Sequence, residues 1–422
     1  MATQNLTTAD KILKDLYVGP IVEQLNYKTY MIDKIEREDP GTVQFAGRRA
    51  IVPVHKSRNR GRGSRGDAGT LPGAGIQGWE DAIINVKQHY QGIELSDLAI
   101  ESTKSNEGAF ISLLDGEVKG AANDMRKDIN RQVFGDGTGL LASVSASATT
   151  TVGPITVDSI QYLHVGDPVD VLRRTDGSTL AGGSDNSVAA LDATAKTVTL
   201  NTATGGTIGT TFGLYDAGNR SNEMDGLRNI VSTSRTLHSI NSATAGNEFW
   251  NGNVRSVGTQ AGSEVVAGES QFELISDDVG MTGQGETSVY ITTRGIRRRL
   301  ADTFQSQKRF TNADAVKVHG GYSAIMVSSG QGEVPVIIDD DCPKTNVFAI
   351  DTSALRWFQL APPGWMERDD GGIFHLKDGS TAGTKVASYQ AWMRWYAALA
   401  SVAPNRLGRL QFCTDDNPTV TA

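Results

Sequence analysis

The chain has 422 residues, 38% hydrophobic and 21% charged, and its 40 basic and 48 acidic side chains give a formal net charge of −8. The acidic excess argues against a general nucleic-acid binder, and without an apolar run of ~18 residues we expect no transmembrane helix. Cys342 and Cys413 form no CxxC pair, which excludes a zinc ribbon or a disulfide framework. No basic stretch feeds an apolar one near Met1, so we expect an intracellular, soluble chain of two or three domains.

The beginning of the chain reads as a short arm. A helix is expected over residues 7–19, because Asp10 can cap it, apolar Leu13 and Leu16 share one face, and the pair at 19–20 is Gly-Pro. A helix this short is unstable alone, so the arm must dock on something.

Residues 42–96 predict an extended β-hairpin. Residues 42–56 read as a strand pair or as one long strand, and residues 78–96 read as a second β-like stretch. Between them, residues 57–75 are rich in glycine and lack an apolar period. The hairpin has too few apolar positions for a core of its own, so we expect it to rest on another molecule.

A single long helix is predicted over residues 105–134. Apolar side chains recur there at steps of three and four, as on one face of a helix, and a Gly-Asp-Gly sequence follows at 135–137. The apolar positions are Ile111, Leu114, Val118, Ala122, Met125, Ile129 and Val133. Thirty residues would span about 45 Å.

The composition changes after that helix. Residues 138–215 carry little charge and form short alternating segments separated by turn residues, which predicts a small β-barrel or sandwich. Strands are expected at 155–157, 167–172, 187–191, 196–200 and 212–215. The remainder mixes an expected helix over 295–310 with expected strands over 335–340, 346–351 and 385–400.

The strongest charge anomaly is a basic stretch at residues 47–66, which has seven positive side chains and no acidic one. Its members are Arg48, Arg49, Lys56, Arg58, Arg60, Arg62 and Arg65. Arginine in a glycine-rich loop can grip phosphates, so nucleic-acid binding through residues 57–66 is one interpretation. We favour the other, contact with an acidic surface of an identical neighbour, because no aromatic residues alternate with the arginines.

The remaining motifs do not indicate catalysis. Residues 61–66 match G-x-G-x-x-G, but Pro72 and further glycines follow, so no helix can begin at the third glycine as a dinucleotide site requires. Asp339, Asp340 and Asp341 follow an expected strand; adjacent strand residues point to opposite faces, which favours a polar strand exit over a metal site. The six histidines show no metal-type spacing. We therefore expect no catalytic residue, cofactor or metal.

Two further groups of side chains have structural explanations. Arginines crowd the expected helix at 295–310, either on a solvated face or as a second charged contact. They are Arg294, Arg297, Arg298 and Arg299, with Lys308 and Arg309 beyond them. Aromatic side chains near the C-terminus read as core and interface anchors. They are Trp357, Phe358, Trp365, Trp392, Trp395 and Tyr396.

The order of arm, basic hairpin, long helix and mixed α/β body resembles the major capsid proteins of tailed bacteriophages, the family with the HK97-type fold. Residues 222–252, 289–310 and 334–357 also resemble segments of that family's body. The resemblance implies an α+β capsid fold with an N-terminal arm (1–40), an extended β-hairpin or E-loop (41–97), a spine helix of the peripheral domain (98–137), a β-rich insertion (138–218), and an axial domain with the rest of the peripheral domain (219–422).

The resemblance further implies pentamers and hexamers that close an icosahedral shell around packaged double-stranded DNA, assembled in the cytoplasm of a bacterial host. Scaffolding, portal and decoration proteins would be partners, and no membrane would be. Contacts between subunits are expected from two sets of side chains. These are Leu13, Leu16 and Ile21 of the arm, and Lys56, Arg58, Arg60, Arg62 and Arg65 of the hairpin. The arm begins almost at Met1, without the scaffolding segment of about a hundred residues that many relatives carry, so a separate scaffolding protein, or none, is expected.

Overall fold

The computed structural model describes residues 30–38, 45–98, 101, 107–148, 152–307, 317–318, 322–323, 325–330, 332–367, 373–379 and 384–416. The predicted arm helix at 7–19, with Leu13, Leu16 and Ile21, lies outside these residues, as do Lys308 and Arg309. No helix in the described part of the chain is long and apolar enough to cross a bilayer.

One long helix, α4 (Glu107–Phe134), forms the spine of the molecule and confirms the prediction over 105–134. Its buried side chains recur every four residues at Ala121, Met125, Ile129 and Val133, so one stripe faces the protein interior. The short helix α2 (Tyr30–Lys34) contacts α4 and adds Met31 to the same core.

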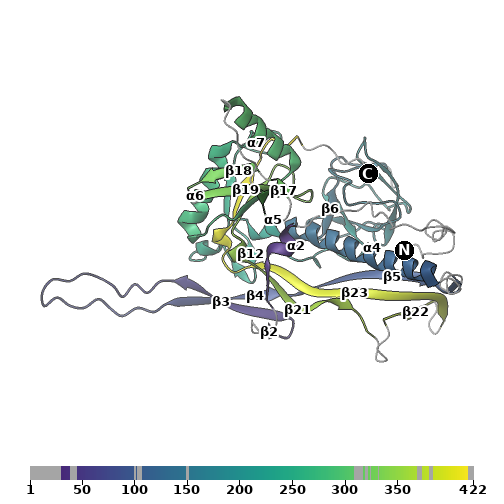
Figure 1. The fold of residues 1–422 in the computed structure, drawn as a ribbon, viewed down its shortest axis with the longest axis horizontal. Helices are drawn as coiled ribbons and strands as arrows, with labels where there is room; N and C mark the ends of the chain where they lie inside the picture. Colours follow the sequence, from purple (N-terminus) through teal and green to yellow (C-terminus); the bar gives the residue numbers. More distant parts are fainter. Residues whose placement is uncertain are drawn as a thin grey trace.

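A five-stranded sheet runs along α4 (Figure 1). Its longest strand, β23 (Lys385–Ser401), pairs on one edge with β5 (Lys87–Ser96). The other edge pairs with β21 (Leu355–Trp365) and β22 (His375–Asp378), and β1 (Glu36–Glu38) adds a parallel strand to β21. Ile93 of β5, Ala391 of β23 and Ala121 of α4 form a small buried cluster, so the helix covers one face of this sheet.

A second, mixed sheet builds the other half of the body. Its order is β14 (Asn253–Ser256), β24 (Gly408–Gln411), β20 (Val347–Ile350), β15 (Val289–Thr292), β19 (Gly332–Ile338) and β18 (Ile325–Ser329). Helices α6 (Glu269–Gly283) and α7 (Arg294–Gln307) lie against it, and Phe272 and Ile296 join its buried cluster. The strands at 335–340 and 346–351 and the helix at 295–310 are thus confirmed with slightly different bounds.

Short elements join these parts. They are α5 (Leu227–Ile230), β12 (Thr236–Leu237), β13 (Ile240–Asn241), η1 (Glu248–Trp250), β16 (Lys317–Val318), β17 (Tyr322–Ser323), η2 (Thr352–Ala354) and η3 (Pro404–Arg406). Of these elements, α5, β12, β13, η1 and η2 contribute buried residues to the core beside α4, in which Trp250 and Trp357 are fully buried.

The β-rich region after α4 is a small closed barrel. Its order is β6 (Leu140–Ser143), β11 (Phe212–Asp216), β8 (Pro168–Arg173), β9 (Asn186–Asp192), β10 (Thr197–Leu200) and β7 (Ile155–Thr156). A bridge between Val144 and Val157 joins the first strand to the last, which selects the barrel from the two predicted alternatives. Val169, Val188 and Leu214 are fully buried in its own core.

The hairpin region differs from prediction in its second half. Strands β2 (Phe45–Ala46) and β3 (Arg49–Ser57) turn at Gly47, whose φ is +66°, so residues 42–56 contain a strand pair. The stretch 78–96 is two strands, because β4 (Gly78–Asn85) pairs with β3 while β5 leaves to pair with β23. Alternation of apolar residues marks a strand but does not name its partner, so this division is invisible in the sequence.

Candidate assembly surfaces

Residues 58–77 form the tip of a long hairpin that projects well beyond the rest of the molecule (Figure 1). The four predicted arginines Arg58, Arg60, Arg62 and Arg65 are all exposed on it. Within the described ranges, the first three make no ion pair, while the Arg65 Nε donates to the Thr70 carbonyl at 2.8 Å. Lys56 lies closer to the body and pairs with Glu80 at 2.7 Å. The structure therefore places the four arginines on the tip and Lys56 on its root.

Asn59 and Gln77 link the two legs of the tip, and the Asn59 amide donates to Gln77 Oε1 at 3.1 Å. Asn59 Nδ2 donates to the Gly75 carbonyl at 2.7 Å, and Asn59 Oδ1 accepts from the Gly61 amide at 2.7 Å. A Cβ at Gly75 would lie 2.3 Å from Asn59 Oδ1, so a side chain there would force the legs apart. Glycine at this point serves close approach of the backbones, which explains part of the glycine content of the loop.

Exposed apolar side chains accompany the arginines, and sequence reasoning missed them. Leu71, Ile76 and Trp79 have exposed fractions of 82%, 87% and 63%. The Trp79 and His55 rings meet in a T-shaped arrangement, with centroids 5.2 Å apart. Each of these side chains is large, apolar and mostly exposed to water, which gives the hairpin the character of an interaction surface. Alternation along β4 could have revealed Trp79, because Ala82 and Ile84 mark the buried face and Trp79 falls on the other face.

The root of the hairpin is anchored on the long sheet. Ala50 of β3 and Ile84 of β4 pack with Phe358 of β21 and with Ala398 and Ala400 of β23. These buried contacts hold the strands from which the tip extends.

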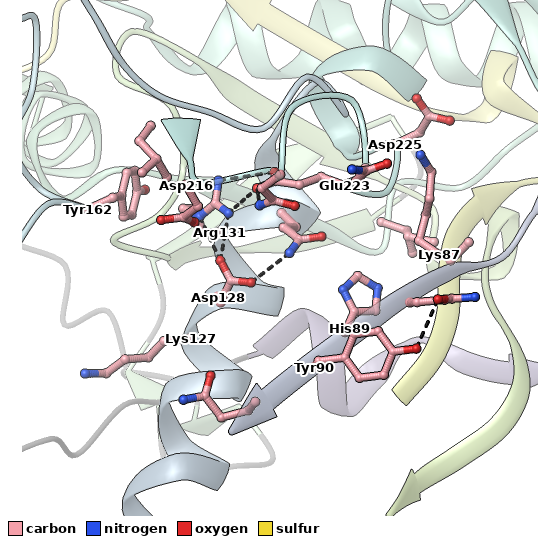
Figure 2. Close-up of a pocket in the computed structure, with 18 of the residues that line it drawn as sticks. Lys87, His89, Tyr90, Lys127, Asp128, Arg131, Tyr162, Asp216, Glu223 and Asp225 are labelled. Carbon is pink, nitrogen blue, oxygen red and sulfur yellow. Dashed lines mark hydrogen bonds and ion pairs between the residues drawn. The ribbon is translucent and has the colours of Figure 1, made fainter. Parts of the chain in front are cut away.

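A cleft of about 1930 Å³ opens between α4, the barrel and the start of the hairpin. Figure 2 shows Arg131 in its wall, with Asp128, Asp216 and Glu223 around the guanidinium. Arg131 Nη2 donates to Asp128 at 2.7 Å and also to Glu223, which is nearly fully buried. The three carboxylates come within 4.8 Å of one another, a spacing that could hold a metal ion. Here the arginine supplies the positive charge among them, and it ties α4 to the segment after the barrel.

Burial shifts the pKa values of two acidic groups in this cluster. Burial raises the pKa of Asp216 to about 6, against the opposing effect of Arg131. Burial likewise raises the pKa of Glu223 above its ordinary value. The cluster is therefore a buried charge network that costs desolvation energy, and it links the barrel to the spine.

A second buried group joins α4, the barrel and the body. Asn130 Nδ2 donates to Asp339 at 3.0 Å and to Asp341 at 2.7 Å, while the Tyr162 hydroxyl donates to Asp341 at 3.2 Å. Asp340 points elsewhere and pairs with Arg294 at 2.6 Å. Burial, together with the charge of Asp341, raises the pKa of Asp339 to about 7. The three residues follow the end of β19, as the strand-exit interpretation expects, but the carboxyls of Asp339 and Asp341 are buried rather than solvated.

Other candidate residues from the sequence have structural roles. Arg299 pairs with Asp416, so at least two arginines of α7 meet acidic groups of the same chain. Trp357, Phe358 and Trp395 are core residues. Burial raises the pKa of Cys413 to about 12 and lowers that of His238 to about 3, which makes neither a reactive group at neutral pH.

Several solved structures of phage capsids and of an encapsulin are similar to this chain. The cyanophage A-1(L) capsid protein matches with a TM-score of 0.54 at 11% identity, over 98% of this chain and 99% of that one. The Myoviridae phage XM1 capsid matches at 8% identity and TM-score 0.47, over 95% and 97% of the two chains. The SrpI encapsulin of Synechococcus elongatus PCC 7942 matches at 10% identity and TM-score 0.45, over 100% and 99%. No family model and no curated protein matches the sequence.

At these identities the likeness defines the fold rather than the function. The chain has the fold of phage capsid proteins, the HK97-type α+β fold that the sequence analysis expected.

Proposed function

We propose that this chain is the major capsid protein of a tailed bacteriophage, which assembles into pentamers and hexamers of an icosahedral shell around packaged double-stranded DNA. One observation supports the proposal: a capsid-type fold extends a hairpin whose arginines and large apolar side chains are exposed in the part of the chain that the structure describes. A shell built from copies of one chain would bury these groups through repeated contacts.

The proposed subunit has the parts expected from the resemblance. The arm (1–40) and hairpin (41–97) reach neighbours, the spine (98–137) and the remainder (219–422) form the body, and residues 138–218 are an insertion. Separate scaffolding, portal and decoration proteins are proposed partners, the virion is the proposed location, and the host cytoplasm is the proposed place of assembly.

Deletion of residues 57–75 tests the role of the hairpin. The buried contacts of the root, at Ala50 and Ile84, lie outside the deletion, so the subunit should stay folded. Negative-stain electron microscopy after size exclusion should show closed shells or five- and six-membered rings for the intact chain, with a scaffolding protein if one is needed. The deleted chain should give neither, and intact shells from it would contradict the role given to the hairpin.

The basic tip also supports a second candidate, a nucleic-acid-binding module. Five basic residues, Lys56, Arg58, Arg60, Arg62 and Arg65, would then contact phosphates, and affinity would fall steeply with salt. Replacing all five with serine separates the two functions. Normal shells with lost nucleic-acid binding would favour the module, whereas lost assembly would favour the capsid subunit.

A further inference from the structure

Two buried oxygen atoms near the end of α4 have no hydrogen-bond partner in the part of the chain that the structure describes. They are Asn130 Oδ1 and Asp339 Oδ2, on side chains that are 0% and 5% exposed. A buried polar atom has lost its bonds to water, so it normally meets another protein group, a trapped water molecule or an ion. Both atoms belong to one group of side chains, Asn130, Tyr162, Asp339 and Asp341, which we call the junction cluster.

The junction cluster gathers oxygen atoms from three parts of the fold. Asn130 comes from α4, Tyr162 from the barrel segment between β7 and β8, and the two aspartates from the segment after β19. Asn130 Nδ2 donates to both carboxyls, and Oδ1 is bonded to the same amide carbon, so it lies beside them. Asp339 Oδ1 also accepts from the Asp341 amide at 3.0 Å, which leaves Oδ2 as the unpartnered oxygen of that carboxyl.

The arginines near the junction cluster are bound to carboxylates outside it. Arg131 lies over the Tyr162 ring at 5.8 Å in the wall of the cleft (Figure 2), but its guanidinium pairs with the acidic groups described above. Arg294 pairs with Asp340. Within the described ranges Asp339 forms no ion pair. The site therefore lacks a positive group that would contact the unpartnered oxygens.

We propose that the junction cluster binds one hard divalent cation, Mg²⁺ or Ca²⁺, through Asp339, Asp341 and the amide oxygen of Asn130. Carboxylate and amide oxygens are the ligands that both ions prefer, and water molecules complete their coordination. Turning the Asn130 amide about its last side-chain bond exchanges Nδ2 for Oδ1. The same residue thus bridges the two carboxyls without the ion and coordinates the ion when it binds. Asp341 and Tyr162 line the cleft, which gives the ion a path from solvent.

The segment after β19 makes this convergence possible. Three adjacent carboxylates on a strand cannot meet at one ion, and Asp340 indeed points elsewhere. Asp339 and Asp341 meet all the same, because they lie beyond the last residue of β19 and Asn130 bonds both of them. A cation there would hold the spine helix, the barrel and the body together within one subunit. The inference goes beyond the proposed function and does not depend on assembly.

A second acidic group, Asp128, Asp216 and Glu223, is the competing place for a cation. There Arg131 already supplies a positive charge, and none of the three carboxyls has a buried oxygen without a partner in the described residues. A proton is the competing occupant of the junction cluster, because burial raises the pKa of Asp339 to about 7. A buried water molecule is another, since it could donate to both oxygens.

Calorimetric titration of the full chain tests the proposal. The protein is dialysed against EDTA, transferred to metal-free buffer at pH 8, where Asp339 has lost most of its proton, and titrated with CaCl₂ or MgCl₂. One cation should bind per chain. At about 100 times its Kd, the cation should raise the ratio of folded to unfolded protein in urea about 100-fold. Asp339→Asn should abolish this gain, whereas Asp340→Asn and Asp216→Asn, matched changes at the neighbouring carboxyl and in the second acidic group, should keep it.

Asn130→Asp gives an independent readout with effects of opposite sign. In EDTA this variant replaces a donor by a third carboxylate beside Asp339 and Asp341, so it should be less stable than wild type. In the presence of the cation it should bind roughly tenfold more tightly than wild type and regain stability, because ligand charge sets the affinity of such sites. An amide with a purely structural role would give the loss of stability without the recovery.

The outcomes separate the candidate occupants and places. A wild-type chain that shows no cation-dependent change would overturn the inference and assign the two oxygens to a proton or a water molecule. Binding that survives in Asp339→Asn but is lost in Asp216→Asn would overturn it in favour of the second acidic group. Equal weak binding in all three variants would mean adventitious surface ions only, which also overturns it. Shell formation is measured separately, so none of these results decides the proposed function.

Discussion

The barrel and the hairpin are both β structures inserted into the same body, yet they satisfy their side chains in opposite ways. The barrel closes its sheet on itself and buries residues such as Val169 and Leu214 completely. The hairpin tip has no enclosed interior, and it leaves Leu71 and Ile76 more than four-fifths exposed. A closed sheet has no free edges and completes its own core, whereas a two-stranded ribbon cannot. The hairpin is therefore the region whose stability must come from elsewhere.

Their ion pairs differ in the same way. Arg131 and Glu223, at the junction with the barrel, have side-chain exposures of 9% and 2%. Lys56 and Glu80, at the hairpin root, have exposures of 31% and 35%. Removing one partner from a buried pair leaves a desolvated charge, but water takes over the role of a lost partner at an exposed pair.

The largest expected effect follows from this contrast. Arg131→Met should lower the free energy of unfolding by about 3–5 kcal/mol, because Glu223 keeps its burial without its cation. Lys56→Met, the matched change at the hairpin, should cost less than about 1 kcal/mol. Urea unfolding at pH 7 measures both values. Equal losses for the two variants would mean that the junction is open to water.

Two leucine substitutions compare the barrel with the hairpin without changing any charge. Leu214→Ala should cost about 3 kcal/mol, because the side chain is 0% exposed and its loss leaves a cavity in the barrel. Leu71→Ala should change subunit stability by no more than about 0.5 kcal/mol, since the side chain is 82% exposed. Of the two substitutions, only Leu71→Ala should weaken assembly at fixed protein concentration. A large stability loss from Leu71→Ala would show that the tip folds back onto its own body.

The pH dependence of the unfolding free energy tests the junction between α4, the barrel and the body. Asp339 has a pKa raised to about 7 in the folded chain, above its ordinary value of 3.8, so the folded state holds this proton more tightly than the unfolded state. Its contribution to stability is therefore lost as the pH rises from about 4 to about 7. Asp339→Asn should remove this fall and make the protein more stable than wild type at pH 8. Asp340→Asn, at the half-exposed neighbour paired with Arg294, should change the wild-type profile in urea unfolding only slightly, because the charge of Asp340 is a minor cause of the raised pKa of Asp339. An unchanged profile in Asp339→Asn would assign the pH dependence to another group.

Local patterns predicted much of the fold. The apolar stripe at Met125, Ile129 and Val133 predicted the spine helix to within two residues, and alternation located five of the six barrel strands but missed β6. The exposure of Arg58, Arg60, Arg62 and Arg65 on a projecting hairpin was also expected, because a charged, glycine-rich stretch has nothing with which to build a core. The contacts assigned to these arginines, to Lys56 and to Leu13, Leu16 and Ile21 stay predictions.

The candidate surfaces were harder to predict from the sequence than the elements were. Tyr90 and Tyr396 lie 306 positions apart in the chain, and no local sequence pattern predicts that they meet in one patch. The burial of Asp339 and Asp341 against Asn130 was likewise missed, because the spacing of acidic residues along a strand says nothing about the helix that covers them.

The sequence by itself determined the kinds of most elements, their order and the cluster of basic charge at residues 47–66, since these depend on residues that are close along the chain. Tertiary structure alone decided that residues 78–96 serve two different sheets, that the barrel closes through Val144 and Val157, and that Tyr90 and Tyr396 meet on one face. Each of these depends on pairing between distant strands, whose free energy comes from burying both partners together rather than from either segment alone.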